Sequence, residues 1–296
     1  MKAIPEPTPP DRTLWINGHL RRGDEAMLSL FDRGARDGEG LFETLRVYGG
    51  QPFAWDRHME RLVLSAAVLG FPVPASPVTL REALDQVLAA EGLTDAVTRI
   101  TVTRGIPGGG IGRASRTGAW VEAEPVTARL WRGTRAGAAT AIVSKRPFEP
   151  GPLGCHKTTS RLAYHIAREE ARAAHADEAL LVSPAGEVLE GTVSNVFAVI
   201  AREVLTPPLA SGILPGITRA LVLSLCAAAG IPARERALTP ADLRAADELF
   251  LTNAAQEIVP VGTLQGAAIP GREVAGRLLE LYRASVARGS DAVAAG

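Results

Sequence analysis

Short extended runs that contain apolar residues flank two glycine turns near the start of the chain. The run Trp15–Arg21 turns at Asn17-Gly18, a strong two-residue hairpin signal. Two further extended runs, Phe42–Tyr48 and Pro52–Trp55, flank Gly49-Gly50. The pattern therefore predicts that the fold begins with β-strands.

The apolar spacing then becomes helical. From Asp56 to Leu69 apolar residues recur at every third or fourth position, and Gly70 ends the pattern. A second helix is predicted over Thr79–Glu91, with Gly92 as its C-terminal cap. Two consecutive helices thus follow the first strands.

The rest of the chain mixes both patterns. Residues 97–103 alternate and predict a half-exposed strand. Further strands are predicted at 139–143, 178–183, 187–189, 195–200 and 248–252. Further helices are predicted at 160–174, 217–229, 240–246 and 272–287. Runs of strands mixed with helices favour a mixed α+β or α/β fold over a strict βαβ alternation.

The length of the chain indicates two domains. Its 296 residues exceed the roughly 100 to 200 residues of a typical domain. The composition changes between residues 125 and 137. We therefore predict an N-terminal α/β domain over 13–127, a linker over 128–136 and a C-terminal α/β domain over 137–290.

Composition and charge exclude several classes of protein. The 32 basic and 32 acidic residues cancel, so the chain lacks the basic footprint of nucleic-acid-binding proteins. No apolar run approaches the roughly 20 residues of a membrane span. Residues 1–12 are polar and rich in proline, unlike a signal peptide. These features predict a cytoplasmic protein without nucleic-acid or membrane partners.

Metal and nucleophile motifs are missing from the sequence. Cys155 and Cys226 form no CxxC pair, and no histidines stand at zinc spacing, so we expect neither a disulfide framework nor a metal site. Cys226 is expected in the core. The stretch Gly105–Gly112 lacks the Gly-Lys-Ser/Thr ending of a phosphate loop, which favours a mobile loop. No G-x-S-x-G or H-E-x-x-H motif appears.

Amine chemistry has few candidates, because only three of the 32 basic residues are lysines: Lys2, Lys145 and Lys157. Arginine stays protonated and cannot form an imine, whereas a lysine can. Lys157 lies in a polar segment followed by hydroxyl residues, Gly-Cys-His-Lys-Thr-Thr-Ser-Arg. A single lysine is more often a solvated surface charge, so this position needs support from other segments.

Two further segments provide that support. Glu190 ends a predicted strand in Leu-Glu-Gly-Thr-Val-Ser-Asn, and a buried carboxylate can pair with a protonated ring nitrogen. Gly216 opens a predicted helix in Leu-Pro-Gly-Ile-Thr-Arg, and the free amides of a helix N-terminus bind phosphate. Alone, the first is explained by a turn glutamate and the second by an ordinary helix cap.

Together and in this order, the three segments resemble the fold-type IV pyridoxal-phosphate enzymes, the class IV aminotransferase family. This family includes D-amino-acid aminotransferases, branched-chain aminotransferases and aminodeoxychorismate lyases. The resemblance runs from about Trp15 to about Leu279. It implies two α/β domains with the cofactor between them, and a homodimer whose partner subunit contributes to the pocket.

The resemblance also implies roles for single residues. Lys157 matches the Schiff-base lysine that also moves protons, Glu190 the partner of the pyridine nitrogen, and Arg61 the phosphate-binding arginine. The other implied cofactor contacts are Ser194, Asn195, Leu214, Gly216, Ile217, Thr218 and Ala254. Many relatives have serine or threonine where this chain has Ala254, so one side-chain contact to the phosphate is missing and only the backbone amide remains.

The reaction is predicted less sharply. Phe42–Arg46 and Thr252-Asn resemble the D-amino-acid aminotransferase and lyase branches more than the branched-chain one. The loop after Gly105 lacks the arginine and histidine clamp of the best-known D-amino-acid enzymes. Arg36 and Arg99 are candidate replacements because arginine binds carboxylates with two hydrogen bonds; alternatively, Arg99 faces solvent and Arg36 braces its loop.

We therefore predict a pyridoxal-phosphate-dependent aminotransferase that passes the amino group of a small amino acid, preferably a D-amino acid, to a 2-keto acid. Phe42, Arg36 and Arg99 are the predicted substrate-binding residues. The lyase reaction, which releases pyruvate from aminodeoxychorismate, is the close alternative. A branched-chain aminotransferase is the third.

Overall fold

The computed structural model describes residues 11–70, 72–107, 116–126 and 137–289. The chain divides into two compact units, Met1–Val126 with Thr158–Ser160, and Thr127–Lys157 with Arg161–Gly296. We call them the N-terminal and the C-terminal unit. The predicted linker 128–136 and most of the predicted mobile loop lie outside the described residues, and the proposed domain boundaries stay a prediction.

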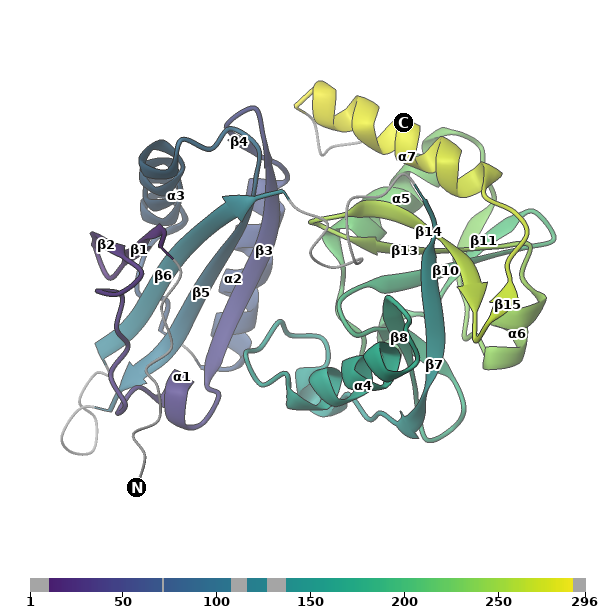
Figure 1. Ribbon diagram of the computed structural model, residues 1–296, viewed down its shortest axis with the longest axis horizontal. Coiled ribbons are helices and arrows are strands. Elements are labelled where there is room, and N and C mark those ends of the chain that lie inside the picture. Colours follow the sequence, from purple (N-terminus) through teal and green to yellow (C-terminus); the bar gives the residue numbers. More distant parts are fainter. Residues whose placement is uncertain (1–10, 71, 108–115, 127–136, 290–296) are drawn as a thin grey trace. The chain divides into compact units, whose positions relative to one another are not determined.

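The N-terminal unit is built on a six-stranded sheet in the order β2-β1-β6-β5-β3-β4 (Figure 1). All of its pairings are antiparallel. Asn17 and Gly18 have φ angles of 48° and 97°, which confirms the predicted hairpin turn. The strands are β1 (Thr13–Ile16), β2 (His19–Arg22), β3 (Gly40–Tyr48), β4 (Gln51–Pro52), β5 (Ala96–Ile106) and β6 (Arg116–Pro125).

Helices α2 (Trp55–Val68) and α3 (Pro77–Glu91) cover the core face of this sheet, and the short helix α1 (Arg33–Arg36) contacts β5. Helix α2 packs on β3, and α3 packs on β1 and β6 (Figure 1). The hydroxyl of Ser76 accepts a hydrogen bond from the amide of Thr79, and Gly92 ends α3 with a φ of 63°. Both long helices were predicted within two residues.

Two details of this unit differ from the prediction. The predicted strand Pro52–Trp55 stops at Pro52, because Ala54 turns the chain with a φ of 55° and Trp55 begins α2. Strand β5 is more buried than the predicted half-exposed strand, since Thr98, Thr101 and Thr103 are all buried. Polar residues on a strand therefore gave a poor measure of its exposure.

The C-terminal unit contains a nine-stranded mixed sheet in the order β12-β11-β10-β13-β14-β7-β8-β9, with β15 paired to β14. Its parallel pairings are β7 with β8, β7 with β14 and β11 with β12. The strands are β7 (Ala139–Pro147), β8 (Glu178–Val182), β9 (Val188–Gly191), β10 (Asn195–Ile200), β11 (Glu203–Thr206), β12 (Ala233–Glu235), β13 (Glu248–Asn253), β14 (Glu257–Leu264) and β15 (Ala267–Ala268).

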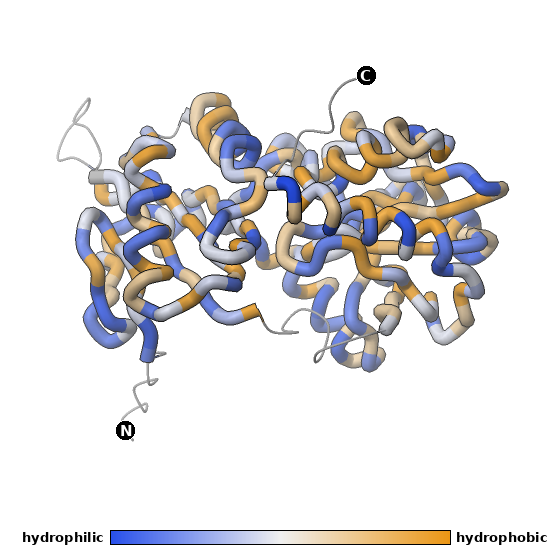
Figure 2. Tube along the Cα trace, turned by 90° about the horizontal axis from the view of Figure 1, so that it is seen from above, coloured by the Kyte–Doolittle hydropathy of each residue, from blue (hydrophilic) through white to orange (hydrophobic). Residues whose placement is uncertain are grey.

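Among its described residues, four α-helices and two short 3-10 helices complete this unit. They are η1 (Gly151–Leu153), α4 (Leu162–Ala173), η2 (Leu209–Ser211), α5 (Ile217–Ala228), α6 (Pro240–Ala245) and α7 (Glu273–Ala287). Hydrophobic residues concentrate along the strands of this unit (Figure 2), which supply most of its core. The rings of Phe197 and Phe250 stack with centroids 4.8 Å apart. Cys226 is fully buried, as predicted.

Strands β6, β11, β12, β14 and β15 were not predicted. Strand β14 contains Pro260, which still pairs with Phe250 in register. Proline argues against a central strand in a sequence pattern, and this accounts for the omission. Within the described part of the chain, no helix is both long enough and apolar enough to cross a membrane.

Candidate active site

Glu190 is a buried carboxylate at the end of β9, with donors on both oxygens. Its Oε2 accepts hydrogen bonds from the amide of Leu214 at 3.2 Å and from Asn195 Nδ2 at 3.3 Å. Its Oε1 accepts one from the hydroxyl of Tyr164 at 3.3 Å. Burial raises the pKa of Glu190 to about 7, and the charge of Arg161 and these donors only partly oppose that rise. All three donors are neutral groups, so none of these hydrogen bonds to Glu190 comes from a cation.

Arg161 and Tyr164 form a stacked pair beside this carboxylate. The guanidinium of Arg161 lies 3.5 Å above the Tyr164 ring and donates to the carbonyl of Thr192 at 2.6 Å. Sequence analysis assigned neither residue a role. Their only signal was position, three residues apart at the start of a helix that follows Lys157.

Lys157 lies in the segment between η1 and α4, five residues before the first residue of α4. Its side chain is half-buried. Its positive charge lowers the pKa of Glu190, so the two groups interact electrostatically within one unit. Lys145 is exposed on β7. The structure therefore associates Lys157, and not Lys145, with the buried carboxylate.

A second buried glutamate, Glu178 on β8, holds the loop that follows Glu190. Its carboxylate accepts hydrogen bonds from the amide of Thr192 at 3.0 Å and from the hydroxyl of Ser194 at 2.9 Å. The Thr192 hydroxyl also donates to it. Ser194 thus braces the loop through Glu178, which gives this predicted cofactor residue a local structural contact. Sequence analysis overlooked Glu178.

The N-terminus of α5 has free backbone amides. Its cap residue Gly216 offers no side-chain hydrogen bond to the first turn, which begins with Ile217 and Thr218. A Cβ on Gly216 would lie 2.0 Å from Oδ1 of Asn195, so the close packing of these two residues requires glycine. The structure therefore brings together Glu190, Asn195, Leu214 and the start of α5.

In the N-terminal unit, Arg61 is held by a third buried glutamate. Arg61 on α2 donates to the carboxylate of Glu43 through Nε at 2.8 Å and through a terminal nitrogen at 2.6 Å. Nδ1 of His58 lies 2.7 Å from the same carboxylate. Burial opposes ionisation of Glu43, but Arg61 and His58 outweigh it and lower its pKa to about 2. Sequence analysis gave neither Glu43 nor His58 a role.

The predicted substrate residues also lie in the N-terminal unit. The guanidinium of Arg99 on β5 lies 3.7 Å above the ring of Phe42, and Nε donates to the hydroxyl of Thr101 at 3.2 Å. Arg99 is half-buried, so it is not a freely solvated side chain. Arg36 ends α1 and is exposed.

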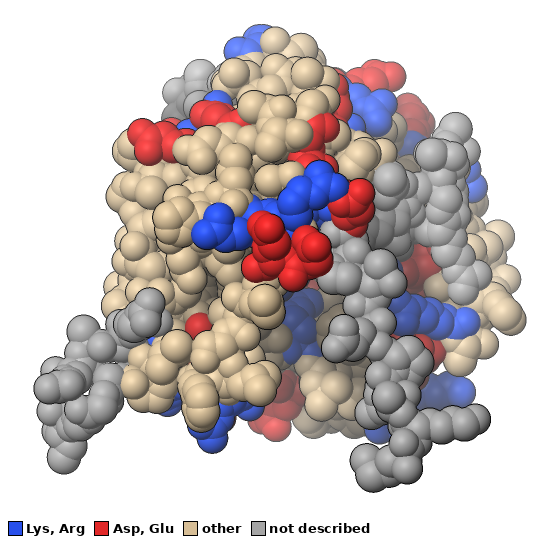
Figure 3. Space-filling model, turned by 60° about the vertical axis from the view of Figure 1, so that its left-hand side comes forward, with Lys and Arg blue, Asp and Glu red and all other residues tan. Residues whose placement is uncertain are grey.

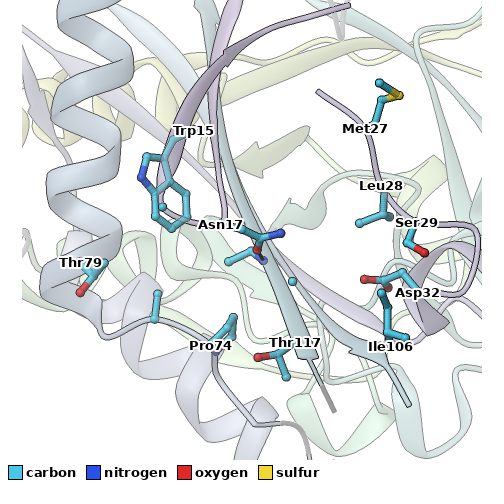
Figure 4. A pocket seen from close by; sticks show the side chains of 14 residues that line it. Trp15, Asn17, Met27, Leu28, Ser29, Asp32, Pro74, Thr79, Ile106 and Thr117 are labelled. Carbon is cyan, nitrogen blue, oxygen red and sulfur yellow. Dashed lines mark hydrogen bonds between the residues drawn. The ribbon is translucent and has the colours of Figure 1, made fainter. Parts of the chain in front are cut away.

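One pocket of about 560 Å³ in the N-terminal unit is lined by none of the predicted site residues (Figure 4). Two of its polar groups already have internal partners. Asn17 accepts a hydrogen bond from the amide of Ala119, and Asp32 accepts one from the hydroxyl of Thr103.

Basic and acidic side chains stand next to one another on the surface drawn in Figure 3, without a broad patch of one sign.

Comparison with known proteins identifies the family. The model for amino-transferase class IV matches residues 40–264. A putative branched-chain-amino-acid aminotransferase of Methanocaldococcus jannaschii is 35% identical over 88% of this chain and 91% of that protein. A D-alanine aminotransferase of Bacillus licheniformis is 32% identical over 86% of this chain and 89% of that protein.

The fold agrees as well. The crystal structure of the branched-chain aminotransferase from Thermoproteus uzoniensis superposes with a TM-score of 0.84 and 30% identity, covering 94% of this chain and 95% of that one. The predicted mixed fold and the predicted family are thereby confirmed. The chain belongs to the class IV aminotransferases, whose cofactor is pyridoxal 5'-phosphate.

Proposed function

We propose that this class IV aminotransferase transfers the amino group of a small amino acid to a 2-keto acid, with D-amino acids such as D-alanine as the preferred donors. The observation that carries the reaction type is the pair of Lys157 and Glu190. The positive charge of Lys157 acts on a fully buried carboxylate whose pKa stands at about 7. A buried carboxylate whose pKa is strongly raised and that feels a nearby positive charge is typical of an active site.

The residues present fit the cofactor. When bound, pyridoxal phosphate supplies an aldehyde for the amine and a ring that accepts electrons. Glu190 would receive the ring N–H, and a positive charge there would lower the pKa of the carboxylate again. The uncapped amides of Ile217 and Thr218 would bind the phosphate. Leu214 and Asn195 position Glu190 through their hydrogen bonds.

Lys157 is the proposed catalytic residue. Its Nζ would attach the cofactor covalently and then carry a proton to and from the substrate α-carbon. Arg61 stays a proposed phosphate ligand, supported by the two hydrogen bonds with which Glu43 fixes its guanidinium. Gly216 and Ala254 stay proposed contacts through their backbone.

Phe42, Arg99 and Arg36 stay the proposed substrate residues. The stacking of Arg99 on Phe42 holds a guanidinium on the sheet face opposite the core, where a carboxylate can bind to it. Arg46 lies on the same face, one register step away, because Thr44 pairs with Arg99 and Arg46 with Val97. It is an additional candidate that the sequence pattern did not single out.

The D-preference is supported by the motif around Phe42 and by the D-alanine aminotransferase among the relatives. A branched-chain aminotransferase activity is the second candidate, because the Methanocaldococcus relative, 35% identical, is named a putative branched-chain-amino-acid aminotransferase. The lyase reaction is the third.

We further propose a cytoplasmic homodimer. The strongly exposed Met27, Leu30 and Phe31 form an apolar segment that a second copy would cover.

The absorption spectrum of the purified holoenzyme distinguishes these candidates. We expect D-alanine to bleach the yellow band of the bound cofactor and pyruvate to restore it, with L-leucine at least about tenfold less effective. Bleaching by L-leucine alone would reverse the stereochemical proposal. A stable band that no amino acid bleaches, together with release of 4-aminobenzoate from aminodeoxychorismate, would establish the lyase. A Lys157→Ala protein that keeps the band would refute the lysine assignment.

A further inference from the structure

Lys157 lies in a stretch of chain without regular secondary structure. Residues 154–161 stand between η1 and α4 and belong to no helix or named strand. A reacting group must be held to a fraction of an ångström, and a loop holds a side chain less precisely than a helix or a strand does. The reactivity of Lys157 therefore depends on what fixes the main chain beside it.

The three residues after Lys157 are bound to the start of β3. Thr158–Ser160 belong to the N-terminal unit, whereas the residues on either side of them belong to the C-terminal unit. Thr158 forms an isolated antiparallel bridge with Leu41. The amide of Thr159 donates to the carbonyl of Gly40 at 2.9 Å. The chain thus enters the N-terminal unit directly after the lysine and leaves it three residues later.

Two hydroxyl groups add to this attachment. Oγ1 of Thr159 and Oγ of Ser160 donate to the carbonyl of Gly38 at 2.9 and 3.0 Å. Gly38 has a φ of 70°, a backbone conformation that favours glycine. A Cβ on Gly40 would lie 2.8 Å from Oγ1 and 3.0 Å from Cγ2 of Thr159. The two glycines thus shape the segment to which Thr159 and Ser160 bind.

The segment that binds these residues also connects two proposed substrate residues. Residues 38–41 stand between Arg36 and Phe42 in the chain. The Phe42 ring in turn lies 3.7 Å below the guanidinium of Arg99. The main chain next to Lys157 is therefore tied by hydrogen bonds to the part of the N-terminal unit that is proposed to receive the substrate carboxylate.

We propose that Thr159 is a positioning residue for Lys157. Its hydrogen bonds to Gly38 and Gly40 fix the main chain that places the lysine for bonding to the cofactor and for proton transfer at the substrate. The inference rests on the proposed function, because it takes Lys157 as the residue that bonds to the cofactor. A misplacement of about 1 Å can cost about a hundredfold in rate. A change at Thr159 should therefore appear in the rates of the lysine's reactions and not in the affinity for the cofactor.

Thr159→Val tests the hydroxyl, because valine keeps the shape of threonine but cannot donate to Gly38. The holoenzyme gives kcat and KM for the amino donor. The apoenzyme gives the rate constant at which pyridoxal phosphate forms the yellow band. It also gives the dissociation constant of pyridoxamine phosphate, which has an amine in place of the aldehyde and cannot bond to a lysine.

We expect kcat and the rate constant of Thr159→Val to fall about tenfold, and KM and the dissociation constant to change by less than about twofold. Thr159→Ser keeps the hydroxyl and should restore both rates. Wild-type rates in Thr159→Val would overturn the inference while leaving the proposed function intact. A loss of affinity for pyridoxamine phosphate as large as the loss in rate would overturn it as well, because the pocket itself would then be damaged.

Thr98→Val is the matched control. Thr98 belongs to the same unit, and its hydroxyl also donates to a main-chain carbonyl, that of Glu122 at 2.7 Å. Thr98 lies within β5 and is not bonded to the segment around Lys157. This variant should lower the melting temperature of the apoenzyme and leave kcat and the rate constant unchanged. An equal loss of rate in Thr98→Val would overturn the inference, because a general loosening of the unit would then explain the effect.

Gly40→Ala tests the same contact from its other side. The added methyl group would displace the side chain of Thr159, so both rates should fall as in Thr159→Val. The affinity for pyridoxamine phosphate should again stay unchanged. A wild-type protein that forms no yellow band with pyridoxal phosphate would overturn the proposed function, and this inference with it.

Discussion

Two buried glutamates, one in each unit, have opposite electrostatics. Glu43 in the N-terminal unit has a pKa of about 2, and Glu190 in the C-terminal unit has a pKa of about 7. Both are fully removed from water, so burial alone does not separate them. Glu43 has a guanidinium bound through two hydrogen bonds and a histidine in contact. Glu190 has three uncharged donors.

The difference shows which of the two carboxylates is neutralised by a hydrogen-bonded cation of the same chain. Glu43 is neutralised by Arg61, and its contribution is to fix that arginine in place. Glu190 is held by neutral groups, while Arg161 and Lys157 act on it only through their charge. A buried carboxylate that no bonded cation neutralises is suited to a cationic partner from outside the chain. The predictions below test this contrast from the largest expected effect to the smallest.

Glu190→Gln should reduce kcat with the preferred amino donor by about a hundred- to a thousandfold. The amide keeps the size of the side chain but removes the negative charge that stabilises a protonated ring nitrogen. The apoenzyme should be at least as stable as wild type in urea, because a costly buried charge is gone. Glu187→Gln, three residues earlier, is the control and should leave kcat unchanged. A Glu190→Gln enzyme with wild-type kcat would remove Glu190 from the mechanism.

Glu43→Gln should instead act on stability. It leaves the guanidinium of Arg61 without its counter-charge, and we expect the free energy of unfolding of the apoenzyme to fall by about 3 kcal/mol. Urea denaturation measures this loss. Glu82→Gln, at an exposed position of α3, should change it by less than about 0.5 kcal/mol. A stable Glu43→Gln protein would show that the pair contributes little, contrary to its geometry.

The sequence predicted the proposed cofactor-binding residues better than the residues that hold them in place. Lys157, Glu190 and Gly216 stand in a recognisable order along the chain, and the structure associates them within one unit. Glu43, Glu178 and Tyr164 were overlooked. Their roles depend on partners 14 to 26 residues away in sequence, such as Thr192 for Glu178 and Glu190 for Tyr164, and periodicity contains no information on such pairs.

The fold shows the same limit. Helices with clear caps, such as α3 and α6, were predicted nearly to the residue, because their ends are set by local chemistry. Strand β14 was overlooked because its partners β7 and β13 compensate for a proline that the local pattern disfavours. Pairing between distant segments decides such strands, and a single sequence does not display it.

The two glutamates should also respond to pH in opposite directions. The pKa of Glu43 is lowered on folding, so its stabilisation is present above about pH 4.5 and is lost as the pH falls toward 2. The pKa of Glu190 is raised on folding, so apoenzyme stability should fall by about 3 kcal/mol as the pH rises from about 4.5 to 7. Urea unfolding of wild type and Glu190→Gln across this range isolates the second effect. Parallel pH profiles of the two proteins would show that Glu190 titrates normally.

Tyr164→Phe is the finest test of the contrast. It removes one neutral donor from Glu190 but keeps the ring on which Arg161 stacks. The Tyr164 hydroxyl stabilises the anion, so its loss should raise the pKa of Glu190 further and shift the pH-dependent fall in stability to higher pH. The cost in catalysis should be about 1 kcal/mol, or roughly fivefold in kcat. Tyr164→Ala, which also removes the stacking surface for Arg161, should cost more. If Tyr164→Phe leaves both the pH profile and kcat unchanged, the amide of Leu214 and the side chain of Asn195 are sufficient to position Glu190.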